Sequence, residues 1–191
     1  MKKTLIYTGF GLAIVIGGTY AVLSLNGEKK EAAATTTKQV VTQQVHKVSQ
    51  VELDEAAKTF SNLASIQKDD DFFYYATITL ALQKLEVKGE KDFTPPNTPS
   101  TIERYQMNRA NLQYLKNKVV ETKASELYQK ILDKWLKGDF SDIQNDLSSV
   151  QKTRAAEGGL PTKVRAQDEE QKYIQTFFGD KGLQINKRDW Q

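Results

Sequence analysis

The sequence predicts an all-α protein with an N-terminal single transmembrane helix, a flexible tether, and a compact helical domain of about five to six helices. Residues 5–25 carry no charge, which is typical of a membrane-spanning helix. All four prolines fall in two places, and the glycines after residue 50 separate segments with helical apolar spacing. The predicted parts are an anchor at 1–27, a flexible linker at 28–49, a helical extracytoplasmic domain at 50–180 and a C-terminal tail at 181–191.

The uncharged segment has the length that a membrane anchor needs. At about 1.5 Å of rise per residue it spans roughly 31 Å, close to the hydrocarbon thickness of a bilayer. Lys3 and Glu28 are the nearest charges on either side. Because this apolar core is longer than that of a signal peptide, we expect an anchor that is retained. The alternative is cleavage after Ala34, which ends an A-x-A-like site.

The orientation of the anchor depends on its flanks. Two lysines stand on each side of the segment, so the positive-inside rule favours neither direction. A very short N-terminal flank before a large C-terminal domain is typical of an export signal. We therefore expect a single-pass protein of the cell membrane, with a cytoplasmic N-terminus, an extracytoplasmic domain, and the lipid bilayer as the partner of its first helix.

Small residues recur every fourth position in this segment, at Gly9, Ala13, Gly17 and Ala21. Such a stripe lets two membrane helices approach closely, which predicts a candidate site of self-association and a homodimer through the membrane helix. The alternative interpretation is that glycine and alanine are simply frequent in membrane helices.

The linker and the domain differ in charge. Residues 28–48 are rich in Ala, Thr, Gln and Val and include His46, the only histidine, for which a tether position predicts no catalytic or metal-binding role. The chain has a net charge of +3, but the excess lies in the first 50 residues, and residues 51–191 carry −1. This balance argues against nucleic acid as a partner.

Six helices are predicted from apolar spacing and start signals. The second also has the aromatic and β-branched content of a strand, but its apolar residues fit a helical face better. The tail shows no persistent pattern. The six are 50–67, with a capping box of Ser49 and Glu52; 70–87; a third from Ser100, with Glu103; a fourth around 127–136; a fifth from Ser141; and a sixth from about 168 to Gly179.

The end of the fourth helix carries the candidate interaction residues Trp135, Asp139, Phe140 and Ser141. Gly138 is expected just after the helix, where a left-handed residue commonly ends it. One interpretation is structural: Trp135 lies in the core, Asp139 or Ser141 caps the next helix, and Phe140 fills the corner. The other is that this corner contacts a ligand.

The run Tyr128-x-x-Ile131-Leu132-x-x-Trp135-x-x-Gly138-Asp139-Phe140-Ser141 resembles the signature of a family of uncharacterised, membrane-anchored proteins of Gram-positive bacteria, a domain of unknown function. The resemblance spans about residues 72–178 and supports the fold and the location, without implying a mechanism. Histidines of that family are replaced here by Ile78, Leu82 and Leu147. Shorter blocks agree in order: Gln83-Lys84-Leu85, Thr98-Pro99 with Ile102, Gly158-Gly159, and Glu169-Glu170-Gln171-Lys172-Tyr173-Ile174.

The residue inventory excludes several chemistries. The chain has no cysteine and one histidine in the tether, so His/Cys metal sites and Ser-His-Asp or Cys-His catalysis are not expected. We predict no catalytic residue, metal or cofactor, and a non-enzymatic module that binds an envelope protein or a wall polymer. The alternative is a cell-wall-active glycoside hydrolase that uses paired carboxylates.

Overall fold

The computed structural model describes residues 45–63, 69–88, 104–154 and 162–191, which belong to one compact unit, Gln43–Gln191. The predicted anchor and its stripe of Gly9, Ala13, Gly17 and Ala21 lie outside the described residues. Among the described residues, no helix combines the length and apolar content needed to cross a membrane.

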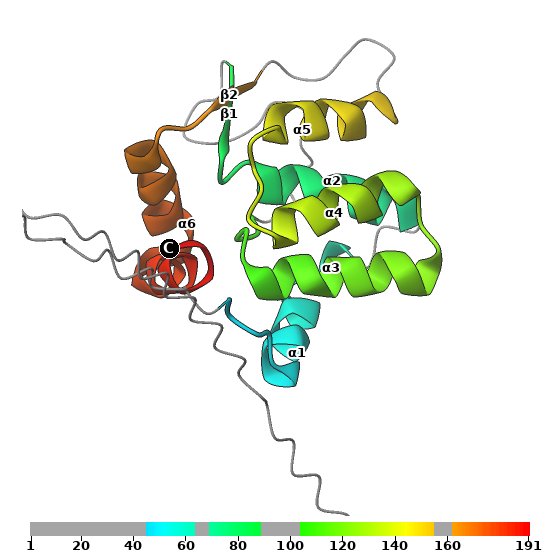
Figure 1. The fold of residues 1–191 in the computed structure, drawn as a ribbon, viewed down its shortest axis with the longest axis horizontal. Coiled ribbons are helices and arrows are strands. Elements are labelled where there is room, and N and C mark those ends of the chain that lie inside the picture. The colour runs from blue at the N-terminus through cyan, green and yellow to red at the C-terminus, as the bar shows by residue number, and fades with distance from the viewer. Residues whose placement is uncertain (1–44, 64–68, 89–103, 155–161) are drawn as a thin grey trace, which may run out of the picture. The chain divides into compact units, whose positions relative to one another are not determined.

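The described part is mostly helical, as predicted, with a short two-stranded sheet that was not predicted (Figure 1). Helix α3 packs against both α4 and α1, and α2 packs against α5. The elements are α1 (Gln50–Thr59), α2 (Asp69–Ala81), β1 (Leu85–Val87), α3 (Arg109–Thr122), α4 (Glu126–Leu136), α5 (Ile143–Lys152), β2 (Thr162–Val164) and α6 (Gln167–Trp190).

Helix α1 begins with the predicted capping box. The Ser49 hydroxyl accepts a hydrogen bond from the Glu52 N–H at 3.3 Å, and the Glu52 carboxylate accepts one from the Ser49 N–H at 2.8 Å. Two N–H groups that the first helical turn leaves unpaired are thus satisfied reciprocally. The helix ends at Thr59, earlier than predicted.

The helix predicted over 70–87 is wrong at its C-terminal end. Helix α2 stops at Ala81, and β1 pairs antiparallel with β2, with Leu85 opposite Val164. Leu85 and Val87 are buried while Glu86 between them is half-buried, which is the two-residue period of a strand.

The third helix begins later than predicted. Ser100 and Glu103 lie outside the described residues, and Tyr105, which falls within the predicted helix, is not helical. Helix α3 starts only after Asn108, whose side chain accepts a hydrogen bond from the Asn111 N–H at 2.8 Å. The Asn111 side chain donates in turn to the Gln106 carbonyl at 2.7 Å. These local bonds hold residues 106–108 outside the helix.

Helix α4 ends at Leu136, and Gly138 follows it as predicted, with a φ of +77°. The Gly138 N–H donates to the Trp135 carbonyl at 2.9 Å and the Asp139 N–H to the Lys134 carbonyl at 3.2 Å. This pair of bonds is a Schellman motif, which satisfies carbonyls left free at the helix end. Helix α5 starts at Ile143, two residues later than predicted, because residues 139–142 form a turn.

The tail, predicted to have no regular structure, is helical. Gly179 does interrupt α6, with a φ of +60°, but helical residues resume and continue to Trp190. The buried positions of this second half are Gly182, Asn186 and Asp189, which are small or polar. No apolar period therefore marks it in the sequence. It is held by hydrogen bonds of its buried polar residues and by the packing of Trp190 against the core.

Most buried apolar side chains form one core cluster under α1 to α5, centred on fully enclosed residues such as Leu80, Leu112 and Trp135. A small second cluster joins Leu82, Val87 and Tyr173 beside the first half of α6. In the second half of α6, Trp190 packs against the main cluster, while Gly182, Asn186 and Asp189 are the buried positions. Two of the three hollows described below are lined in part by this half.

We expect Gly138→Ala to lower the free energy of unfolding by about 1 kcal/mol, because a side chain disfavours the left-handed conformation. A Cβ at this position would only make ordinary contact with the Trp190 ring, 3.8 Å away, so crowding contributes little. Urea unfolding measures the change. Lys123→Ala is the control, since Lys123 already carries a Cβ at a φ of +55°. Equal losses in the two variants would contradict the explanation.

Candidate functional site

Trp135 is fully buried in the core, and its indole N–H donates to the Asp146 carboxylate at 2.9 Å. The Lys134 ammonium contacts the same carboxylate at 3.1 Å. Asp146 thus joins α5 to the end of α4. The Trp135 ring supports this corner from inside and presents no surface of its own.

Asp139 and Ser141 form the turn between α4 and α5. One Asp139 carboxylate oxygen accepts hydrogen bonds from the Ser141 hydroxyl at 2.7 Å and from the Ser141 N–H at 3.1 Å. These bonds lower the pKa of the Asp139 carboxyl, with the hydroxyl bond as the largest cause. The prediction that Asp139 or Ser141 caps α5 is wrong: neither side chain accepts a hydrogen bond from an N–H of its first turn, and its N-cap position is Asp142.

Phe140 covers a charged pair that joins distant parts of the chain. The Lys84 ammonium lies 4.3 Å from the centre of the Phe140 ring and 2.8 Å from the Glu170 carboxylate. The Phe140 ring also meets the Trp190 ring edge-on, with the ring centres 5.1 Å apart. Three of the blocks that carry the resemblance, around residues 84, 140 and 170, therefore meet at one place.

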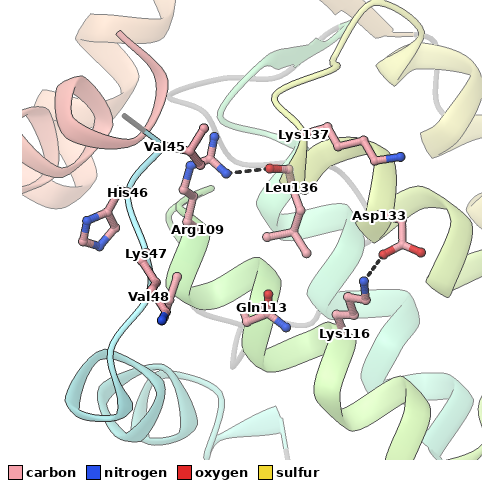
Figure 2. A pocket seen from close by; sticks show the side chains of 10 residues that line it. All are labelled: Val45, His46, Lys47, Val48, Arg109, Gln113, Lys116, Asp133, Leu136 and Lys137. Carbon is pink, nitrogen blue, oxygen red and sulfur yellow. Dashed lines mark hydrogen bonds and ion pairs between the residues drawn. The ribbon is translucent and has the colours of Figure 1, made fainter. Parts of the chain in front are cut away.

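Next to this corner lie two adjoining hollows, of about 590 and 350 Å³. We call them together the basic groove. They share the lining residues Val45, His46, Arg109 and Lys137. Figure 2 shows the larger hollow, with the chain at residues 45–48 on one side and the side chains of α3 and α4 on the other. The groove thus lies where the linker enters the domain.

Positive charge dominates the groove. Among the described residues, two acids line it, and both are engaged: Asp133 pairs with Lys116, and the enclosed Asp189 carboxylate accepts a bond from Arg188 at 2.8 Å. The ammonium groups of two of its lysines, at positions 47 and 137, form no hydrogen bond or ion pair with any described residue. The basic lining residues are Lys47, Lys84, Arg109, Lys116, Lys137 and Arg188.

Arg109 is held rigidly between the two hollows. Its guanidinium donates to the Leu136 carbonyl at 2.6 Å and to the Asp189 carbonyl at 3.1 Å, and it stacks over the Trp190 ring at 4.7 Å. Figure 2 shows the bond to Leu136. Because a guanidinium has five N–H donors, it can make these bonds and still offer a donor to an anion.

His46, which the sequence places in the linker, joins the edge of the groove. Its Nε2 lies 2.9 Å from the Glu52 carboxylate, and Arg188 of α6 donates to the same oxygen at 2.7 Å. The linker end, α1 and α6 therefore meet at Glu52. The only sequence signal for this contact was the capping box at Glu52, which already placed its carboxylate near residue 49.

The environment of Glu52 sets its pKa at about 2, below the ordinary 4.5. Burial raises the pKa, but hydrogen bonds from Ser49 and His46 and the charge of Arg188 outweigh it. The ionised form is thus favoured in the folded protein, where it anchors the groove edge.

Residues 98–175 match a family of unknown function (DUF6241). The match includes α3, α4 and α5 and ends within α6. It agrees with the predicted resemblance to an uncharacterised domain. Neither the curated proteins nor the solved structures include one that matches the chain. In the part of the chain that the structure describes, no group of His, Cys, Asp or Glu side chains could hold a metal ion.

We expect the stability of the protein to fall as the pH drops from about 4.5 toward 2, in part because Glu52 becomes protonated. A carboxyl with a lowered pKa contributes stability above its unfolded pKa and loses it as the pH falls through the folded value. We expect Glu52→Gln to have a lower free energy of unfolding than the wild type at neutral pH, as measured by urea unfolding. This free energy should also decline less steeply as the pH falls. Glu126→Gln, which removes an 85% exposed carboxyl, is the control and should keep the wild-type profile. An unchanged slope in Glu52→Gln would contradict the assignment.

Proposed function

We propose that the chain is a non-enzymatic binding module, held at the cell membrane of a Gram-positive bacterium by its N-terminal segment, with the domain outside. Its basic groove binds an anionic group of an envelope component, either a protein or a wall polymer. The observation that carries this proposal is the concentration of basic side chains in one groove of a domain whose residues 51–191 carry a net charge of −1.

The basic groove suits an anion because it combines one rigidly held cation with two flexible ones. The Arg109 guanidinium is fixed by bonds to the Leu136 and Asp189 carbonyls, so little entropy is lost when it contacts an anion. Lys47 and Lys137 supply charges on flexible stems on either side of it. An anion in the groove would therefore meet one oriented donor and two adaptable ones.

The carboxyl groups of the groove favour binding over hydrolysis. A glycosidase needs two carboxyl groups that face the same bond across a cleft. Of the two acids here, Asp133 is paired with Lys116, and the Asp189 side chain is enclosed and bonded to the Arg109 N–H at 2.7 Å. This pair offers neither a free acid nor a free nucleophile, so the glycoside hydrolase alternative has no support in the groove.

The double variant Lys47→Glu with Lys137→Glu tests the groove. We expect it to weaken binding of a short inorganic polyphosphate to the full-length protein by about tenfold or more, because two attractions become repulsions. Calorimetric titration at two salt concentrations measures this, and the wild-type affinity should fall as salt rises. Poly-glutamate in the same assay reports whether carboxylates are accepted as well.

The matched control is Lys130→Glu with Lys172→Glu, which changes the net charge equally at exposed positions away from the groove. It should bind polyphosphate nearly as the wild type does. If both double variants lose affinity to the same extent, the overall charge and not the groove governs binding, and the proposal fails.

The location is tested with a single thiol, since the chain has no cysteine. We expect Lys130→Cys, whose position has a side chain 77% exposed, to react in intact cells with a maleimide that does not cross membranes. Thr4→Cys, on the other side of the predicted anchor, should react only after lysis. The reverse pattern would place the domain in the cytoplasm.

A further inference from the structure

A separate hollow of about 460 Å³ lies between α1, the start of α3 and the second half of α6. Three amide side chains line it, those of Gln106, Asn108 and Asn111, and we call it the amide groove. All three are strongly buried, with exposed fractions of 6%, 9% and 5%. Polar side chains that are buried in this way are normally hydrogen-bonded through all their polar atoms.

Each amide uses one of its two polar atoms inside the protein. The Gln106 nitrogen donates to the Gly182 carbonyl at 2.7 Å, and the Asn111 nitrogen donates to the Gln106 carbonyl at 2.7 Å. The Asn108 oxygen accepts from the Asn111 N–H at 2.8 Å. Because each bond requires that particular atom, the orientation of all three amides is fixed.

The other atom of each amide has no hydrogen-bond partner among the described residues. These atoms are Gln106 Oε1 and Asn111 Oδ1, which accept, and Asn108 Nδ2, which donates. None of them belongs to the side-chain atoms that are sealed from solvent without a partner. They therefore keep some contact with solvent, and they belong to side chains that line the groove. The three side chains thus offer two acceptors and one donor for a ligand.

The groove has an apolar wall and a charged rim. Val51, Ala56, Ala110, Phe178 and Ile185 line the walls. At the rim, Glu52 pairs with Arg188 at 2.7 Å and Glu55 pairs with Lys58 at 2.8 Å. The Arg104 guanidinium lies 5.5 Å from the centre of the Phe177 ring. This combination of neutral amides and apolar walls suits an uncharged ligand that has both donors and acceptors.

We propose that the amide groove binds a neutral sugar unit that carries an acetamido group. The acetamido carbonyl would accept from Asn108 Nδ2, its N–H would donate to one of the two amide oxygens, and its methyl group would contact the apolar wall. Sugar hydroxyls can satisfy the remaining acceptor, and the Phe178 ring offers a surface for the apolar face of the ring. This site is independent of the basic groove, although Arg188 lines both.

The variant Asn108→Asp isolates the free donor. Aspartate keeps the oxygen that caps α3, and it is as good an N-cap as asparagine, so the fold is retained. It replaces the Nδ2 donor with an acceptor, which cannot bind the acetamido carbonyl. Asn117→Asp is the matched control: it makes the same change on the same helix, and its oxygen still accepts from Gln113.

The test is titration of the full-length protein with N,N′,N″-triacetylchitotriose, followed by calorimetry and by NMR shifts of the side-chain amides. The protein is kept in a detergent without a sugar headgroup. We expect wild type and Asn117→Asp to bind alike, and Asn108→Asp to bind at least about tenfold more weakly. Unfolding curves of all three proteins show that the fold is intact.

Three results would overturn the proposal. The first is the absence of binding at millimolar sugar, and the second is equal binding by Asn108→Asp and wild type. The third is binding of a neutral peptide such as trialanine, and not of the sugar, at the same amides, which would make the groove a peptide site. Because polyphosphate binding is measured separately, failure here leaves the basic groove to be judged by its own variants.

Discussion

The buried side chain of Gln83 is the contact on which the arrangement of the C-terminal half depends. It is fully enclosed, and all of its bonds run to other parts of the chain. Its nitrogen donates to Glu170 at 2.9 Å and to Asn186 at 3.1 Å, and its oxygen accepts from the Met107 N–H at 3.0 Å. One amide thus joins the end of α2, both halves of α6 and the segment before α3.

The hydrogen bonds of Gln83 position segments that line both grooves. Because they hold Met107 and Asn186 together, the segment at 104–108 runs beside the second half of α6 and gives the amide groove its floor. The same contact brings Trp190 within reach of the Met107 carbonyl, to which its indole N–H donates at 2.9 Å. Trp190 then supports Arg109 in the basic groove. Directional bonds, and not apolar area alone, therefore define the surfaces that the protein offers to partners.

The sequence could predict those elements whose inward residues are apolar. Helix α4 was predicted with its end at Gly138, because paired apolar positions one turn apart precede a glycine. The second half of α6 could not be predicted, because its inward residues, such as Asn186, are polar. They are buried by contacts with residues that are distant in the sequence. The strand Leu85–Val87 is too short for its two-residue apolar period to be distinguished from the helical pattern that precedes it. Neither groove was predicted, since each gathers residues from separate segments, as Lys47 and Arg109 do in the basic groove.

The ion pair of Lys84 and Glu170 has a consequence for how this domain can change over time. Their side chains are only 14% and 16% exposed, so each charge depends on the other for compensation. Losing one partner leaves a poorly hydrated charge in this place. Replacing both removes the two charges together and leaves Asn186 as the acceptor of the Gln83 amide. The two positions are therefore bound to vary together. A lineage that abandons one of these charges must pass through an unstable intermediate or change both at once.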